Sequence, residues 1–382
     1  MTSKERLMTA FRRKKADRVP VCPDISVMVP AKRTGRPFHE LFLDGSDHTG
    51  WTSETYTKVY VDTVKYFGMD GWYVYGGLKE IRPPDAPEFI DTIETVQDGK
   101  LVKRICHTRL GDLTEEEMFF ADEPPWKETK PVKDLKEDFK KLKLWMGTGP
   151  WKYEATFRDR DRIGNLGVYS PVVPVFQDWW FNLRHGGFER CFMDFHEEEE
   201  FMEEVHELYL EWALAYVRAL AKAHPDEVMF GGSSASLSIS SPALFRKYEL
   251  PLLQQAAKIC HEEGVLAHLH VCGRSWELVE IVAEETDIDV MEPMEEPPGG
   301  NVDIAEAKRR FGNKLCIKGN INTFDFMLNA TPEQVKEKCR RLIDAAAADG
   351  GFVLSTGDQC GRDTPHENIF AMVEVAETYG RY

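Results

Sequence analysis

The chain has 382 residues and a formal net charge of −17, with 42% hydrophobic and 30% charged residues. This length fits one large domain or two ordinary ones, and the hydrophobic content is sufficient for a buried core. The acidic charge argues against nucleic-acid binding, which needs clustered Lys and Arg side chains. No apolar run is long enough to cross a membrane, and no apolar signal region follows Met1, so we expect a cytoplasmic protein.

Short β-like runs alternate with helical segments along the chain, which is the pattern of a parallel sheet wrapped by helices. Eight such runs, none followed by a glycine-rich phosphate loop, predict a (β/α)₈ TIM barrel as a single domain over residues 1–382. An open doubly wound sheet usually has fewer strands. The expected strands are Arg18–Asp24, Gly71–Tyr75, Gly167–Val175, Glu227–Phe230, Val265–Cys272, Ile288–Met291, Leu315–Lys318 and Gly351–Ser355.

Three hydroxyl–proline pairs mark expected helix starts between or after these strands. A Ser or Thr hydroxyl can cap the first backbone N–H groups of a helix, and proline is tolerated in the first helical turn. We therefore expect helices to begin at Ser241-Pro242, Thr331-Pro332 and Thr364-Pro365.

The stretch from about 93 to 150 interrupts the alternation, before the third expected strand. Within it, Thr95–Arg104 predicts a hairpin that turns at Asp98-Gly99. A charged, proline-containing sequence follows. We interpret the stretch as an insertion, and the sequence leaves open whether it is a lid, a docking surface or a surface loop without a function of its own.

The sequence His268-Leu-His270-Val-Cys272-Gly273 is the strongest signal of chemistry. Alternate side chains of a strand share one face, so these three point into the barrel, with Cys272 at the carboxyl end where barrel active sites lie. Cys360 follows the last expected strand at the same rim. Two thiolates and one imidazole suit zinc and leave a position open for substrate. The spacing fits buried core residues equally well, and His268, which lies deeper, is expected to be structural.

The motifs His270-Val-Cys272-Gly273 and Gly357-Asp-Gln-Cys360-Gly-Arg-Asp-Thr364-Pro-His-Glu-Asn368 resemble the uroporphyrinogen decarboxylase superfamily. The resemblance is strongest to its zinc- and corrinoid-dependent methyltransferases, and it extends over nearly the whole chain, least across the insertion. It implies that His270, Cys272 and Cys360 hold one zinc ion. No Asp-x-His-x-x-Gly corrinoid motif is present in this chain. The resemblance therefore implies that the corrinoid, a cobalamin, is carried by a partner protein that docks at the barrel rim.

Two segments depart from the family pattern. The segment Cys22–Pro30 has no arginines of the kind with which the decarboxylases grip propionate groups, so porphyrinogen decarboxylation is disfavoured. The segment Gly231–Ser234 stands where many relatives have an acidic residue after the fourth strand. This second departure indicates a differently shaped substrate pocket.

The zinc motif fits two directions of methyl transfer. Zinc can activate a thiol that attacks methylcobalt, or polarise a methyl ether oxygen while cobalt(I) takes the methyl group. Aromatic side chains at the ends of the second and third strands suit a flat apolar ligand, although they also suit packing of the barrel against its helices. We therefore expect O-demethylation of a methoxylated, aromatic substrate. The alternative is a methylcobalamin:thiol methyltransferase with a coenzyme M-like acceptor, and a non-catalytic corrinoid or tetrapyrrole binder fits less well.

Further candidates lie at the ends of other strands. Glu292, at the end of strand six, is a candidate fourth zinc ligand, whereas Glu295 and Glu296 are expected in a solvated loop. The oligomeric state is not determined by the sequence, and a homodimer is compatible with it. The candidates for catalysis or substrate binding, each with a structural role as the alternative, are Asp24, Tyr75, Gln177, Trp179 and Asn320.

Overall fold

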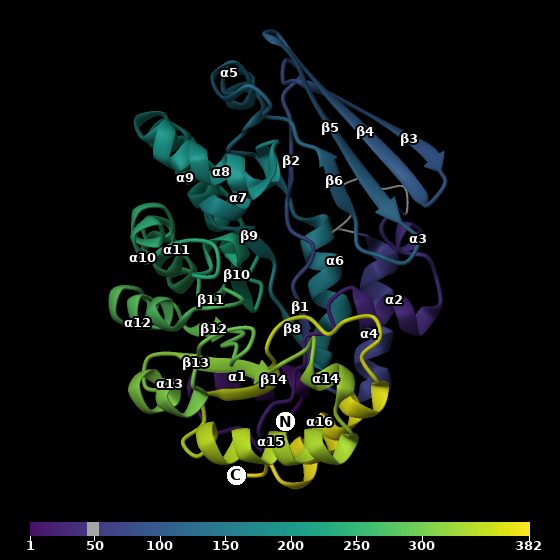
Figure 1. The fold of residues 1–382 in the computed structure, drawn as a ribbon, viewed down its shortest axis with the longest axis vertical. Coiled ribbons are helices and arrows are strands. Elements are labelled where there is room, and N and C mark those ends of the chain that lie inside the picture. Colours follow the sequence, from purple (N-terminus) through teal and green to yellow (C-terminus); the bar gives the residue numbers. More distant parts are fainter. Residues whose placement is uncertain (44–52) are drawn as a thin grey trace.

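The computed structural model describes residues 1–43 and 53–382, and within them the expected eight-stranded TIM barrel is confirmed (Figure 1). Six parallel strands form one continuous ladder in the order β14-β13-β12-β11-β10-β9, and β1 pairs with β8. The barrel strands are β1 (Gly71–Tyr73), β8 (Gly167–Tyr169) with β9 (Val172–Pro174), β10 (Glu227–Gly231), β11 (Leu266–His270), β12 (Val290–Glu292), β13 (Cys316–Ile321) and β14 (Phe352–Thr356).

The first barrel strand is reduced to a single parallel bridge between Val21 and Leu354. The Cys22 N–H donates to the Leu354 carbonyl at 2.8 Å, and the Asp70 N–H donates to the Val21 carbonyl at 2.9 Å. These bonds connect the segment to β14 on one side and to the residue before β1 on the other. The expected strand Arg18–Asp24 is shorter because Pro20 and Pro23 have no N–H to donate to a ladder.

The third barrel strand is divided at Ser170 and Pro171, so the predicted run Gly167–Val175 becomes β8 and β9. The β8 half pairs with β1 and the β9 half pairs with β10. Pro171 lacks the donor that would continue one ladder through both halves.

An outer layer of helices surrounds the strands, and the hydroxyl caps Ser241 and Thr331 are present where the sequence predicts them. The expected cap at Thr364 is wrong, because the last helix begins at His366 and receives no side-chain cap. The principal outer helices are α4 (Glu54–Phe67), α6 (Glu154–Ile163), α9 (Glu199–Lys222), α11 (Leu250–Glu262), α12 (Trp276–Glu285), α13 (Ile304–Phe311), α15 (Pro332–Ala346) and α16 (His366–Thr378).

Further helices occupy the loops and one end of the barrel. None of the described helices is long and apolar enough to cross a membrane. The further helices are α1 (Ser3–Phe11), α2 (Met28–Thr34), α3 (Phe38–Phe42), α5 (Leu135–Trp145), α7 (Phe176–Leu183), α8 (Gly187–Glu197), α10 (Pro242–Leu244), α14 (Phe326–Asn329), the 3₁₀ turns η1 (Gly164–Leu166) and η2 (Ser233–Ala235), and the π-helical turn η3 (Phe245–Glu249).

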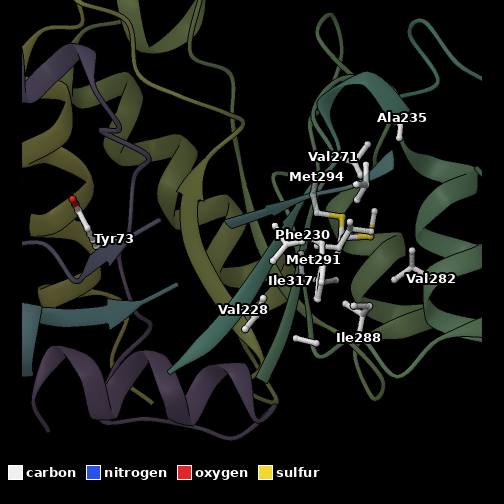
Figure 2. Close-up of a cluster of buried hydrophobic side chains, with 14 of the residues drawn as sticks. Tyr73, Val228, Phe230, Ala235, Val271, Val282, Ile288, Met291, Met294 and Ile317 are labelled. Carbon is white, nitrogen blue, oxygen red and sulfur yellow. The ribbon is translucent and has the colours of Figure 1, made fainter. Parts of the chain in front are cut away.

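Two hydrophobic cores follow from the alternation of side chains along the strands. Val228 and Phe230 of β10 face the outer helices, where they join the large core that Figure 2 shows in part. Met229, between them, belongs to the second core inside the barrel. Leu7 and Phe11 of α1 also belong to that inner core, so α1 closes the amino-terminal end of the barrel.

The inserted segment forms an antiparallel sheet that extends away from the barrel (Figure 1). The expected hairpin turns at Gln97 and Asp98, one residue before the predicted position, and two further strands follow it. One side of the sheet is buried through side chains such as Val102, Cys106 and Leu113. The strands of this region are β3 (Glu88–Val96), β4 (Gly99–Thr108), β5 (Gly111–Phe120) and β6 (Trp126–Thr129), with β2 (Lys79–Glu80) pairing with β7 (Trp151–Lys152) beside them.

Candidate metal centre

Three adjacent strands bring chemically distinctive side chains to one level near the carboxyl end of the barrel. His270 is the last residue of β11 and lies opposite Glu292, the last residue of β12. Met291 lies opposite Ile317 of β13, so the following residue, Lys318, is level with Glu292. The register of the parallel strands therefore produces the row His270, Glu292, Lys318.

Glu292 is the centre of this row and uses both of its carboxylate oxygens. Its Oε1 is hydrogen-bonded to Nδ1 of His270, and its Oε2 accepts from Lys318 Nζ at 2.7 Å. Burial alone would raise the pKa of Glu292, but the positive charges of Lys318 and His270 outweigh it and lower that pKa well below its usual range. With Nδ1 of His270 held by a carboxylate, its Nε2 is left to face a metal, the usual arrangement of a metal-binding histidine.

Cys272, Glu295 and Asp358 form the tightest group of potential metal ligands in the described parts of the chain. One ligand atom from each lies within 4.8 Å of the others. Glu295 is buried, and its Oε1 accepts a hydrogen bond from the Gly273 N–H. The expectation of a solvated loop is therefore wrong for Glu295, because that N–H draws its carboxylate inward.

Asp358 reaches this group from the loop after β14. Its backbone has a φ of 125°, a conformation that few non-glycine residues adopt. Its Oδ1 accepts from the Gln359 N–H at 2.8 Å. Such conformations persist where the surrounding structure imposes them, and they cluster at functional sites.

Cys360 lies two residues after Asp358 and is fully buried. Its N–H donates to the Asp24 carbonyl at 2.7 Å, which ties the loop after β14 to the loop after the first strand. Burial is the main cause of a pKa well above the usual value for the Cys360 thiol, and the carboxylates of Asp24 and Asp358 add to it. Ligand atoms of His270, Cys272 and Cys360 are not all within 4.8 Å of one another in the described chain.

The residues at this rim fit a zinc ion chemically. A thiol, an imidazole and carboxylates are the ligands zinc takes, and catalytic zinc sites use three protein ligands. The pKa of His270 is lowered by burial, but the Glu292 carboxylate and the Cys272 side chain outweigh burial and raise it well above its usual value. The surroundings of His270 are therefore electronegative.

Asp24 and Tyr75 lie on the side of the rim next to Cys360. The Asp24 Oδ1 accepts from the Ser26 N–H at 2.8 Å, and the Ser26 hydroxyl lies 3.0 Å from the Tyr75 hydroxyl. Burial raises the pKa of Asp24 to about 6; the positive charge of Lys318 opposes this shift, and the negative charges of Glu292 and Asp358 add to it. The structure thus groups these two candidates with the metal-ligand cluster.

The other three candidates are engaged in packing or in holding loops. Gln177 is buried, and its Oε1 accepts from the Ser240 hydroxyl at 2.7 Å. Trp179 is 6% exposed, with its ring 5.2 Å from that of Tyr209 on α9. Asn320 donates to the Met294 carbonyl at 2.8 Å and so holds the loop that carries Glu295.

Two further residues near this rim, Lys318 and Asp178, were not predicted from the sequence. In the sequence, Lys318 ends a short apolar run and belongs to no motif that would single it out. Asp178 follows β9, and its carboxylate accepts from the N–H groups of Ser233 at 2.9 Å and Ser234 at 2.6 Å. Burial raises the pKa of Asp178, and the nearby His270 opposes that shift. The Gly-Gly-Ser-Ser turn after strand four thus lies against a carboxylate supplied by the preceding unit.

A small cavity of about 290 Å³ adjoins the loop that carries Asp358 and Cys360. Gln359 and Gly361, which flank Cys360, both line it. The cavity has the size of a small-molecule site rather than of a corrin ring. Its remaining lining residues are Met28, Glu123, Thr323, Phe324, Leu328, Arg362, Asp363 and Thr364.

A TIM barrel with a thiol, an imidazole and carboxylates gathered at its carboxyl rim has the architecture of a metal-dependent barrel enzyme. The chain belongs to the uroporphyrinogen decarboxylase family, whose model matches residues 182–379. It is 24% identical to a methylcobamide:CoM methyltransferase, MtbA, of Methanosarcina acetivorans, over 99% of this chain and 98% of that protein. A uroporphyrinogen decarboxylase of Coxiella burnetii is 26% identical over 44% of each chain.

The fold is also found among solved structures. A methyltransferase from Methanosarcina mazei superposes with a TM-score of 0.68 over 99% of both chains, at 17% sequence identity. A second relative, the methylcobamide:CoM methyltransferase MtaA of Methanosarcina barkeri, is 27% identical over 47% of this chain and 50% of its own. The expected resemblance to methyltransferases of this family is confirmed.

Proposed function

We propose that this protein is a zinc-dependent methyltransferase that moves a methyl group between a small substrate and a corrinoid carried by a partner protein. The observation that carries the proposal is the histidine–carboxylate pair His270–Glu292 beside Cys272, with Glu295, Asp358 and Cys360 at the same rim. We propose His270, Cys272 and Cys360 as the zinc ligands.

The remaining residues would prepare the site rather than carry the methyl group. Zinc supplies a Lewis acid that stabilises a thiolate or an oxyanion near neutral pH. Glu292 fixes the ring of His270, and the Gly273 N–H fixes the Glu295 carboxylate near Cys272. Both oxygens of Glu292 are engaged, so we assign it to orientation of His270.

A small thiol is the better-supported methyl acceptor. The aromatic residues that favoured a methoxylated ring, such as Trp179 and Trp180, are buried in packing. A relative that is similar over the whole chain is a methylcobamide:CoM methyltransferase. Methoxyarene O-demethylation is the second candidate, because Met28, Phe324 and Leu328 give the adjoining cavity an apolar wall.

Two assays on the purified protein distinguish methylation of a thiol from O-demethylation. We expect about one zinc per chain by metal analysis, and loss of the methylcobalt absorbance when methylcobalamin and a small thiol such as 2-mercaptoethanesulfonate are added. Formation of methylcobalamin from cobalt(I) cobalamin and a methoxylated aromatic would instead establish O-demethylation. A protein without zinc, or one inert in both assays, would overturn the proposed function.

Substitution of the two thiols tests the ligand assignment. Cys272→Ala and Cys360→Ala should lose the zinc and the methyl transfer while the barrel still folds, because each removes one of three protein ligands. Cys339→Ala is the matched control, since Cys339 is as buried as Cys360 but lies on α15. Full zinc content in both rim variants would show that the ligands are other residues, with Glu295 and Asp358 the next to substitute.

A further inference from the structure

Lys318 is buried in the middle of the barrel, where it pairs with Glu292 rather than with a proposed zinc ligand. Lys318 and Glu292 are 0% and 1% exposed, and their side chains form an ion pair 2.7 Å long. Burial lowers the pKa of Lys318, but the carboxylates of Glu292 and Asp24 outweigh burial and raise it. The barrel therefore encloses the positive charge of Lys318, and Glu292 lies between that charge and the proposed zinc ligand His270.

An aromatic ring of the inner core also holds the ammonium group of Lys318 in position. Lys318 Nζ lies 3.7 Å from the centre of the Trp72 ring, a favourable cation–π contact. The Trp72 indole N–H in turn donates to Glu227 Oε1 at 2.7 Å, and that same oxygen lies 3.1 Å from Nδ1 of His268. A chain of polar contacts thus extends from the inner core to the metal rim.

The buried ion pair between Lys318 and Glu292 has an unfavourable desolvation free energy. Removing two charges from water costs several kcal/mol per ion, and apolar replacements of buried ion pairs are often equally stable or more stable. Val353, which lies opposite Lys318 on the neighbouring strand, is apolar and packs in the inner core. A barrel of this kind does not need the ion pair in order to fold, so its position beside His270 indicates a function at the rim.

We propose that Lys318 is a positioning residue for the metal centre: it holds Glu292 in place, and Glu292 holds the His270 ring with Nε2 facing the metal. The inference rests on the proposed zinc site and extends it by one residue. Lys318 touches neither metal nor substrate, so its effect has to pass entirely through Glu292.

The test compares zinc affinity in four proteins: the wild type, Lys318→Met, Glu292→Gln and the double variant. Affinity is measured by competition with a chromogenic chelator. We expect about 10- to 100-fold weaker binding in each single variant, the usual effect of removing the support of a metal-binding histidine. The double variant should bind as weakly as Glu292→Gln alone, because Lys318 has no other route to the metal.

A spectroscopic measurement separates positioning from simple loss of stability. Cobalt(II) is substituted for zinc, and its visible absorption bands report the ligand geometry. We expect altered bands in Lys318→Met and unchanged bands in Lys308→Met, a control whose half-buried ammonium bonds to the Gly350 carbonyl on the outside of the barrel. If Lys318→Met alone fails to fold, the neutral double variant still reports the loss of affinity.

The possible results distinguish a failure of the proposed function from a failure of the positioning role alone. A wild-type protein that binds no zinc would overturn the proposed function and this inference with it. Zinc in the wild type, with unchanged affinity and cobalt bands in Lys318→Met, would overturn the positioning role alone. A further loss of affinity in the double variant relative to Glu292→Gln would also overturn it, because Lys318 would then act by a second route.

Discussion

At the scale of single residues, Glu249 is a buried carboxyl whose protonation is coupled to folding. Burial raises its pKa to about 8, although the N–H groups of Phe176 and Gln177 donate to it and oppose the shift. The folded protein therefore keeps a proton that the unfolded chain releases near pH 4 to 5. The stability that this proton contributes is complete below that range and is lost as the pH rises towards 8.

The substitution Glu249→Gln should remove this pH dependence, because an amide does not titrate. Relative to the variant, the wild type should lose stability by up to about 1.4 kcal/mol per pH unit between about pH 5 and pH 8. Urea unfolding of both proteins across this range measures the difference. Parallel pH profiles for the two proteins would contradict the shift.

The proposed zinc ligands and the carboxylates beside them differ in how readily the sequence predicts them. His270 and Cys272 share a strand face, and strand alternation alone predicts that they point inward. Glu295 and Asp358 join Cys272 only through loop conformations, one set by the Gly273 N–H and the other by a backbone with positive φ. No periodicity reports such contacts, which explains why these two residues were not predicted.

At the scale of elements, helix α1 closes the amino-terminal end of the barrel. Phe11 is fully buried, with its ring 5.8 Å from that of His268 inside the barrel. Phe11→Ala should lower the free energy of unfolding by about 3–5 kcal/mol, the usual cost of removing a buried phenylalanine side chain. Phe370→Ala on α16 is the control, since that ring is 38% exposed.

Urea unfolding monitored by circular dichroism checks this prediction. Equal losses in the two variants would mean that α1 is not part of the cooperative core. If α1 only closes the barrel, zinc content should stay the same in Phe11→Ala at temperatures where the variant is folded.

The strands show where sequence patterns succeed and where they fail. Eight apolar runs predict eight barrel positions because each strand must bury both faces, as in β10 and β11. The prediction fails in detail where proline removes a hydrogen-bond donor, at Pro20 and at Pro171. The insertion was underestimated because strands such as Glu88–Val96 are mostly exposed and mix charged, polar and apolar residues without a regular apolar pattern.

At the scale of the whole molecule, metal binding and folding should be coupled. A metal that binds the folded chain and not the unfolded chain raises the melting temperature. Treatment with a strong chelator should therefore lower the melting temperature of the wild type by a few degrees. The melting temperature of Cys272→Ala, which should hold no zinc, is expected to be insensitive to the chelator, and calorimetry with and without chelator checks both.

The four neighbouring strands β11, β12, β13 and β14 carry the row His270–Glu292–Lys318 and the loops with Glu295, Asp358 and Cys360. One uninterrupted stretch of chain, which lies inside the family match over residues 182–379, thus encodes the entire proposed zinc site. The antiparallel sheet and the first barrel units lie outside that match. The proposed zinc site can therefore be inherited as a single unit, whatever changes in the first half of the chain.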